Sequence, residues 1–271
     1  MGDEEPSSTD QLIDRLVGVI EDDQRVVASL LGGSRARGRA DTFSDVDVSV
    51  ILADTDYEDV LAEKAAFVRQ LGDPLFIEDF GQRNMALVVF ADGVELDLFF
   101  FPEHDVGSIR PGMHQVLVDP SGLLAEIPIE DAEVDRDAQA DELRRILSWF
   151  WHDVGHFTTA IGRGQLWWAA GQLEQLRHYC VNLVRIEQSS APGDEAYWKL
   201  DVEISTGSLE ALRATFVPIE RDAMLDAGRR IVAFFRERAP EIARANDVDY
   251  PADLADLVTG HLEELPGSSS G

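Results

Sequence analysis

Three aspartates in the first half of the chain stand within otherwise apolar segments, where charged side chains are uncommon. Asp45 and Asp47 lie in the segment SDVDVSV, and Asp97 lies in the segment VELDLFF. Side chains at positions i and i+2 of a β-strand point to the same face, so we expect Asp45 and Asp47 to project together. Three carboxylates that meet on one face would form a hard oxygen site suited to Mg²⁺. Two ions held by such carboxylates can activate an attacking oxygen and stabilise a leaving pyrophosphate.

A glycine turn in the segment GGSRARGR precedes the first two aspartates. Backbone N–H groups at Gly33 can approach phosphate oxygens without a clash with a Cβ atom, and Ser34 adds a hydroxyl group. Arg35 and the arginines after it can neutralise a triphosphate as bidentate donors. The turn is therefore a predicted nucleotide-binding site, formed by Gly33, Ser34 and Arg35.

Neither feature is specific by itself. A Gly-Gly-Ser sequence is commonly only a turn, and D-x-D pairs arise by chance in a chain with 30 aspartates. The apolar surroundings of the three aspartates are what favour a site over a solvated surface. His104, His114 and His156 show no spacing that is typical of metal ligands.

The first half of the chain mixes strand and helix patterns. Helices are predicted at 11–25 and 59–71, and strands at 26–31, 46–52, 85–90 and 94–101, with an edge strand at 116–118. Asp92-Gly93 between two apolar runs predicts a hairpin, because Asp-Gly suits a tight turn. We therefore expect an α+β domain over residues 1–125, with a mixed sheet and flanking helices.

The pattern changes after Asp119-Pro120, where an acidic stretch is followed by long segments whose apolar residues recur at helical spacing. Helices are predicted at 141–161, 165–186, 209–216, 219–238 and 253–264. Pro240 is expected just beyond the end of its helix, because proline cannot donate to the helical ladder. Residues 126–271 are therefore predicted to form an all-α domain, a helical bundle.

The stretch GGSRARGRADTFSDVDVSV resembles the signature of the polymerase-β-like nucleotidyltransferase superfamily. That signature is a Gly-Ser turn, two carboxylates at i and i+2, and a third carboxylate on a later strand. The resemblance implies that Asp45, Asp47 and Asp97 hold two Mg²⁺ ions, and that Gly33, Ser34 and Arg35 bind the triphosphate.

A finer resemblance covers most of the chain. The helical segment LWWAAGQLEQLRHYCVNLVRIEQ, which follows LDLFFFPEHDV, is similar to the aminoglycoside 6-adenylyltransferases, or streptomycin adenylyltransferases. The resemblance implies that AMP passes from ATP to a hydroxyl group of a small molecule of aminoglycoside type, with release of pyrophosphate, as in antibiotic resistance. Gly171 stands about where this family would have an acidic general base. Glu174, one helical turn later, is the substitute that we assign to catalysis, with an ordinary surface ion pair as the alternative.

Two other functions stay open at this point. The chain could be a nucleotidyltransferase that modifies a protein or an RNA, as an antitoxin does, or a nucleotide-binding module without catalysis. The presence of all three carboxylates argues against the second.

The composition and net charge of the chain indicate the kind of solvent and compartment in which the protein works. Its 271 residues carry 52 acidic against 23 basic side chains, a formal net charge of −29, and 45% are hydrophobic. Bulk nucleic-acid binding is not expected from such a chain, and neither a membrane span nor a secretory signal is recognised. Cys180 is the single cysteine, which fits the reducing cytoplasm. We interpret the acidic excess as that of a halophile's cytoplasmic protein, and it also suits a cationic, hydroxylated acceptor.

The halophile hypothesis predicts that the free energy of unfolding rises from low to molar KCl. The reason is that the Debye length falls from roughly 30 Å at 0.01 M to roughly 3 Å at 1 M, so that repulsion between the acids is screened. Urea unfolding in a KCl series measures this. Greater stability at low salt would contradict the hypothesis.

Overall fold

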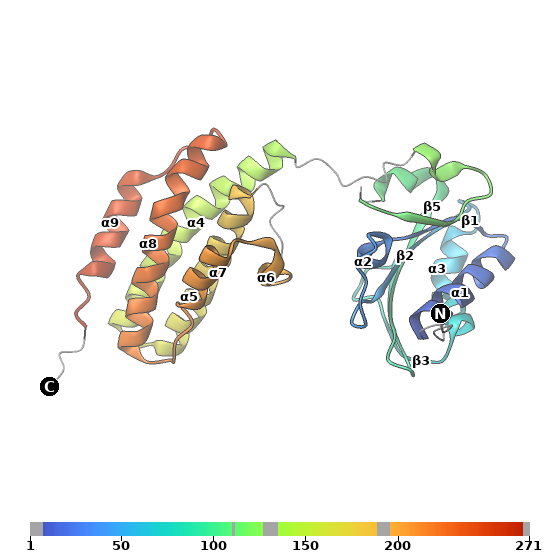
Figure 1. Ribbon diagram of the computed structural model, residues 1–271, viewed down its shortest axis with the longest axis horizontal. Helices are drawn as coiled ribbons and strands as arrows, with labels where there is room; N and C mark the ends of the chain where they lie inside the picture. Colours follow the sequence, from blue (N-terminus) through green and yellow to red (C-terminus); the bar gives the residue numbers. More distant parts are fainter. Residues whose placement is uncertain (1–7, 110–111, 127–134, 189–195, 268–271) are drawn as a thin grey trace, which may run out of the picture. The chain divides into compact units, whose positions relative to one another are not determined.

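The computed structural model describes residues 8–109, 112–126, 135–188 and 196–267. The chain forms two compact units, Met1–Ala132 and Glu133–Gly271 (Figure 1). The first is α+β and the second is all-α, as predicted. Much of the predicted junction, residues 127–134, lies outside the described residues, so the domain limits 1–125 and 126–271 stay a prediction.

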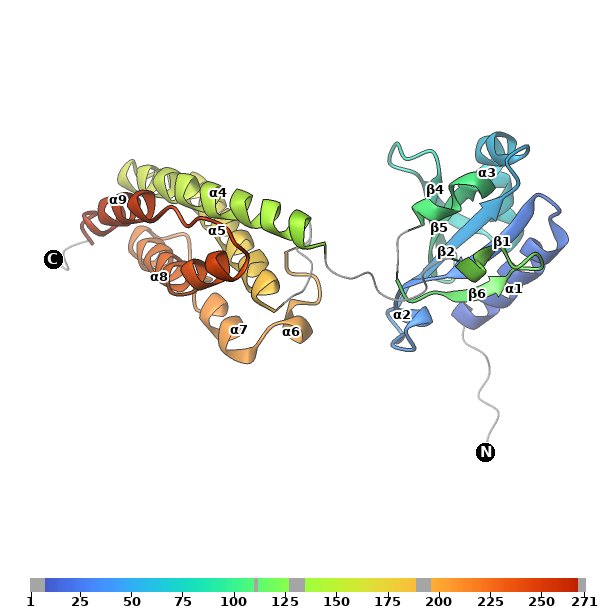
Figure 2. The same ribbon diagram turned by 90° about the horizontal axis from the view of Figure 1, so that it is seen from above.

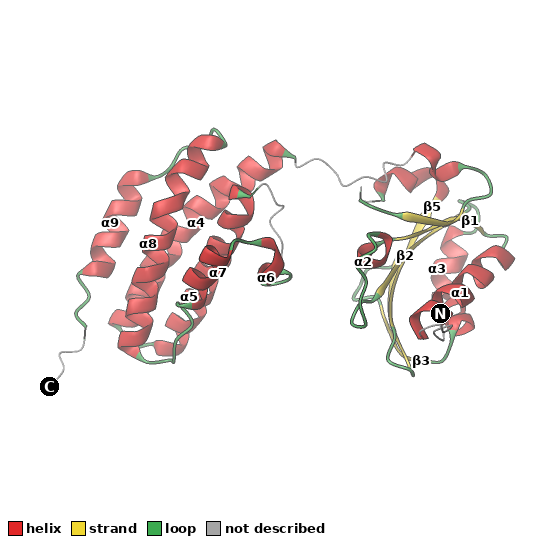
Figure 3. Ribbon diagram, viewed as in Figure 1, coloured by secondary structure: helices red, strands yellow, loops and turns green. Residues whose placement is uncertain are grey.

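A mixed sheet forms the centre of the first unit, and Figure 3 distinguishes its strands from the helices. The described strands are β1 (Val26–Leu31), β2 (Val46–Leu52), β3 (Pro74–Glu78), β4 (Met85–Phe90), β5 (Glu95–Pro102) and β6 (Gln115–Val118), in the order β3-β4-β5-β2-β1-β6. Among them, β2 and β5 pair in parallel, while the other neighbours are antiparallel. The parallel pair therefore lies in the middle of the sheet.

Two amphipathic helices cover one face of this sheet, α1 (Ser8–Asp22) and α3 (Tyr57–Leu71) (Figure 1). Their apolar residues join those of β2, β4 and β5 in one hydrophobic core. The opposite face is covered less: a smaller cluster of β1 and β2 residues packs there against the 3₁₀ segments η1 (Glu103–Ser108) and η2 (Leu123–Glu126). The short helix α2 (Gly33–Ala36) follows β1.

The second unit is a helical bundle, which Figure 2 shows from above. Its described helices are α4 (Arg136–Gly162), α5 (Leu166–Glu187), α6 (Leu200–Glu203), α7 (Thr206–Arg213), α8 (Arg221–Ala245) and α9 (Ala252–Glu263). The long helices share one core, in which the rings of Phe150 and Phe235 stack with centroids 3.5 Å apart. None of the helices in the described ranges is both long and apolar enough to cross a membrane.

Most predicted elements are confirmed, among them the β4–β5 hairpin, whose turn places Gly93 at φ +84°. Strand β3 was not predicted, because it is a partly exposed edge strand without clear alternation, and it begins at Pro74. Proline is tolerated at the first residue of an edge strand. Helix α7 begins three residues earlier than predicted, where Ser205 caps it by accepting a hydrogen bond from the Ser208 N–H group.

The predicted end of a helix before Pro240 is wrong, because α8 continues through this residue to Ala245. Proline removes one helical hydrogen bond. Beyond it, however, Ile242 and Ala243 are buried in the bundle core, and Ala239 before it is fully buried. Burial of these side chains offsets the lost hydrogen bond, so tertiary packing overrides the local preference.

Candidate active site

The three predicted aspartates lie close together in the first unit. Asp47 of β2 and Asp97 of β5 are partners in the parallel register, and both are partly buried. Asp45 lies just before β2, which begins at Val46 as predicted. One carboxylate oxygen from each of the three lies within 4.8 Å of the others. The structure therefore forms a compact anionic cluster at the start of two adjacent strands.

The cluster projects from the face of the sheet that α1 and α3 leave uncovered. The strand residues directly before and after Asp47 and Asp97 are at most 1% exposed and belong to the core beneath these helices. Since side chains alternate along a strand, the two aspartates point to the opposite face.

The carboxylates repel one another. The pKa of Asp97 is raised to about 6, first by burial and then by the negative charges of Asp47, Asp45 and Glu95. Both causes disfavour the ionised carboxylate, and a bound cation would reverse the second. The donor set, all carboxylate oxygen, is the one that Mg²⁺ prefers.

The glycine turn lies against the same cluster. The Gly32 N–H group donates to the Asp47 carbonyl oxygen over 2.9 Å. Gly33 has φ +63°, and a Cβ atom there would lie 1.7 Å from Asp47 Oδ2. A residue without a side chain is thus required at Gly33. Ser34 Oγ is buried and has no hydrogen-bond partner among the described residues, so it is an unused donor at this turn.

Arg35 ties the turn to its surroundings. Its Nε donates to the Asp45 carbonyl oxygen over 3.3 Å, and its Nη1 lies 3.7 Å from Asp10 Oδ1 on α1. The side chain is 16% exposed. Arg35 therefore positions the backbone that carries Asp45, in addition to the phosphate contact predicted for it.

Two neighbours of the turn, Asp10 and His114, carry no signal in the sequence. Asp10 pairs with Arg35, and His114 is adjacent to Gly32: its Nδ1 lies 3.6 Å from the place of a Cβ atom there. His114 comes to this position because β6 pairs with β1, with Gln115 opposite Leu31. No sequence spacing signals either contact, since both depend on the tertiary fold.

Glu174 belongs to the second unit, on α5. Its carboxylate lies 2.5 Å from Arg177 Nη1 and 3.3 Å from His178 Nε2. The pKa of Tyr197 is raised, mainly by burial and further by its hydrogen bond to Glu174. Glu174 and Arg177 also line a groove of about 490 Å³. The carboxylate is thus part of an ion-pair network in which Arg177 is buried, and the assignment of Glu174 to catalysis stays a prediction.

Comparison with known proteins relates the chain to one family. Residues 7–265 match the model of a family described as streptomycin adenylyltransferase. Among solved structures, the chain is similar to an aminoglycoside 6-adenyltransferase from Bacillus subtilis, with 18% identity, coverage of 96% of this chain and 98% of that one, and a TM-score of 0.46. A nucleotidyltransferase-like protein from Exiguobacterium sibiricum has 8% identity, coverage of 86% and 77%, and a TM-score of 0.42. No curated protein sequence matches the chain.

Gly33→Ala tests the close approach of the turn to Asp47. We expect this variant to lose more stability than Gly38→Ala, by about 1 to 3 kcal/mol, which is the usual cost of forcing a methyl group into filled space. Gly38 is the matched control, because it has the same φ of +63° but open space where a Cβ atom would lie. Urea unfolding of both variants measures the difference. Equal losses would show that Asp47 does not press against the turn.

Asp97→Asn tests the repulsion in the metal-free protein. A raised folded-state pKa means that wild-type stability falls as the pH rises from about 4 to about 6, because only the unfolded state then releases the proton freely. Above this window we expect the variant to be more stable than wild type by about 1 kcal/mol, after allowance for solvent screening.

The measurement is urea unfolding in EDTA from about pH 3 to weakly alkaline pH, with Asp14→Asn, an exposed acid on α1, as the control. The difference between Asp97→Asn and wild type should nearly vanish at about pH 3, below the unfolded-state pKa of about 3.9, where the carboxyl is mostly protonated in both states of the wild type. A variant no more stable than wild type in weakly alkaline buffer would rule out the repulsion.

Proposed function

The chain belongs to the streptomycin adenylyltransferase family, and from this premise we propose that it is a Mg²⁺-dependent enzyme that transfers AMP from ATP to a hydroxyl group of a small molecule of aminoglycoside type. The observation that carries the proposal is the cluster of Asp45, Asp47 and Asp97 beside the Gly33 turn. In the transfer, the acceptor oxygen forms a bond to the α-phosphorus. The bond from that phosphorus to the bridging oxygen breaks, and pyrophosphate leaves with the electron pair.

Asp45, Asp47 and Asp97 are proposed to hold two Mg²⁺ ions. Three features support the fit: the all-carboxylate donor set, the raised pKa of Asp97, and the close approach of the Asp47 carboxylate to the Gly33 backbone, which a Cβ atom would prevent. When bound, Mg²⁺ supplies positive charge that neutralises the triphosphate and the developing charge of the leaving group. The aspartates themselves fix where that charge can sit, because the sheet register holds Asp47 and Asp97 side by side.

The turn and Arg35 are proposed to bind the phosphates. Backbone N–H groups near Gly33 and the Ser34 hydroxyl donate to phosphate oxygens without a bulky side chain in the way. The Arg35 guanidinium adds a fixed positive charge, and its bond to the Asp45 carbonyl oxygen keeps the turn and the carboxylate in one geometry.

Glu174 is proposed as the general base that takes the proton of the acceptor hydroxyl. A carboxylate paired with Arg177 and His178 is held in a defined orientation, which a base needs before it can act within hydrogen-bond reach. The same contacts would serve a purely structural network. Replacement by Gln separates the two, because it preserves the shape and removes the basicity.

The setting proposed for the enzyme follows from its charge. Residues 1–125 would bind ATP and residues 126–271 would form the helical domain, in the cytoplasm of a halophile. A net charge of −29 attracts a cationic acceptor such as a polyamine sugar. Family membership favours this small-molecule acceptor over a protein or an RNA.

The assay incubates the protein with Mg²⁺, ATP and a panel of aminoglycosides, and follows pyrophosphate release. We expect release that depends on both the metal and the acceptor. Asp47→Asn should lower kcat by about a thousandfold, because a lost metal ligand removes several kcal/mol of charge stabilisation. Its circular dichroism spectrum should match that of the wild type.

Glu174→Gln in the same assay should lower kcat with little change in KM if Glu174 is the base. An unchanged kcat would assign Glu174 to structure alone. If no small acceptor gives pyrophosphate release but AMP is transferred to a protein or an RNA, the proposed class of acceptor is wrong. Retained activity in Asp47→Asn would show that the metal site is misplaced.

A further inference from the structure

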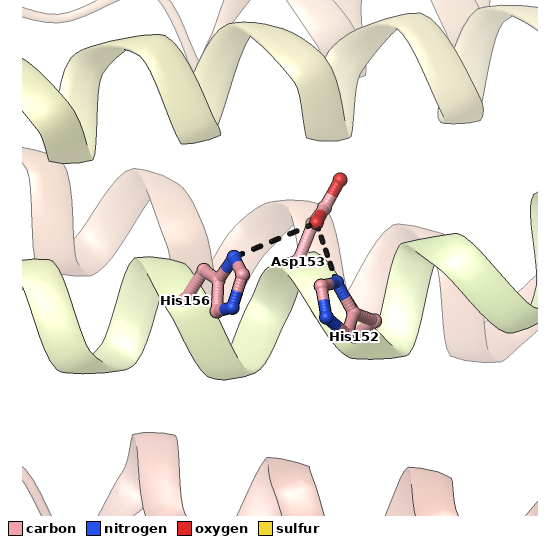
Figure 4. Close-up of side chains that lie close together, drawn as sticks. All are labelled: His152, Asp153 and His156. Carbon is pink, nitrogen blue, oxygen red and sulfur yellow. Dashed lines mark hydrogen bonds and ion pairs between the residues drawn. The ribbon is translucent and has the colours of Figure 1, made fainter.

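A second group of metal-ligand side chains lies on α4, in the helical unit (Figure 4). His152 Nδ1 is 2.9 Å from Asp153 Oδ1, and His156 Nδ1 is 3.9 Å from the same oxygen. One ligand atom from each of the three residues lies within 4.8 Å of the other two. His152 and His156 are four residues apart, so they share one face of the helix.

The Asp153 carboxylate, which lies between the two rings, is buried and is held by a hydrogen bond from a neighbouring helix. Asp153 is 8% exposed, and its second oxygen, Oδ2, accepts a hydrogen bond from the Tyr179 hydroxyl of α5 over 3.0 Å. Oδ1 is thereby turned toward the histidines.

The imidazoles, in contrast, reach solvent. The side chains of His152 and His156 are 50% and 47% exposed. An ion could therefore enter from the solvent side, and at least one coordination position would remain for water or another ligand.

We propose that His152, Asp153 and His156 bind a transition-metal dication of the Zn²⁺ class. Bonds of roughly 2.0–2.2 Å to N and O ligands place neighbouring ligand atoms of a tetrahedral ion roughly 3.3–3.5 Å apart. The two distances in the structure, 2.9 and 3.9 Å, bracket this separation. Small rotations of the exposed rings would bring all three atoms to bonding distance.

The chemistry of the donors separates this site from the carboxylate cluster of the first unit. Imidazole nitrogen prefers Zn²⁺, Co²⁺ and Ni²⁺, whereas an all-carboxylate site suits Mg²⁺. The hydrogen bond from Tyr179 is the kind of outer contact that orients a ligating carboxylate.

An ordinary His–Asp ion pair is the competing explanation. One imidazole is enough for such a pair, and the 2.9 Å contact of His152 provides it. The 3.9 Å contact of His156 is too long for a hydrogen bond, so the pair alone does not account for the second ring beside the same oxygen. A cation bound by His152, Asp153 and His156 together accounts for the position of both rings beside this oxygen.

Two tryptophans provide a reporter. The Trp149 ring lies 5.1 Å from the His152 ring, and the Trp168 ring lies 5.8 Å from the His156 ring, measured between centroids. Co²⁺ or Ni²⁺ bound to these histidines would quench the fluorescence of both tryptophans.

The experiment titrates the full-length, untagged protein with Co²⁺ while excess Mg²⁺ occupies the carboxylate site. We expect saturable quenching with one Co²⁺ ion per chain, reversed by Zn²⁺. His156→Gln and His152→Asn should each weaken binding by more than about tenfold, and Tyr179→Phe by about tenfold, through the lost outer contact. His261→Gln, an exposed histidine on α9, is the matched control and should bind as wild type.

Asp47→Asn should also bind Co²⁺ as wild type, which makes the result independent of the proposed transferase activity. Circular dichroism checks that each histidine variant is folded. Absence of saturable quenching in the wild type would leave only a His–Asp pair and overturn the proposal. Equal Co²⁺ affinity in wild type and in a His152→Asn, His156→Gln double variant would do the same.

Discussion

Repulsion between carboxylates on neighbouring strands is the constraint around which the first unit is built. Asp47 and Asp97 face each other in the parallel register of β2 and β5, and burial adds to the cost of ionising them. The sheet cannot relieve the repulsion by slipping. A shift of one residue would turn these charges into the core and expose the apolar residues beside them. The core beneath α1 and α3 therefore determines where the negative charge is held.

The turn after β1 extends the same constraint to the backbone. The hydrogen bond from Gly32 to the Asp47 carbonyl ties the turn to β2, and the one from Arg35 to the Asp45 carbonyl ties it to the residue just before this strand. The Asp47 carboxylate occupies the space that any side chain at Gly33 would need. The carboxylates and the donors that we propose for phosphate binding thus keep a fixed relation before any ligand arrives, which lowers the reorganisation that binding would require.

The parts of the fold and of the candidate sites that could be predicted are those marked by a pattern within a short stretch of sequence. Strands β1 and β2 are apolar runs with clear limits, and the aspartates stood out because charge is rare in such runs. The pairing of Asp10 with Arg35 and the place of His114 arise from distant segments, so no local pattern contains them. No metal-ligand spacing was assigned to His156 from the sequence, although His152 lies one helical turn before it, because the orientation of Asp153 between them depends on Tyr179, 26 residues away. Packing of this kind also carries α8 through Pro240.

The acidic chain and its phosphate chemistry are compatible because salt acts differently at different distances. At physiological ionic strength the Debye length is about 8 Å, so exposed acids farther apart than this scarcely interact. The three site carboxylates lie within 4.8 Å of one another, and two of them are partly buried. Salt therefore screens the repulsion between these three carboxylates only weakly, even at concentrations that screen the repulsion between exposed acids on the surface. A net charge of −29 therefore need not oppose a triphosphate locally, while the cluster keeps its attraction for a divalent cation in concentrated salt.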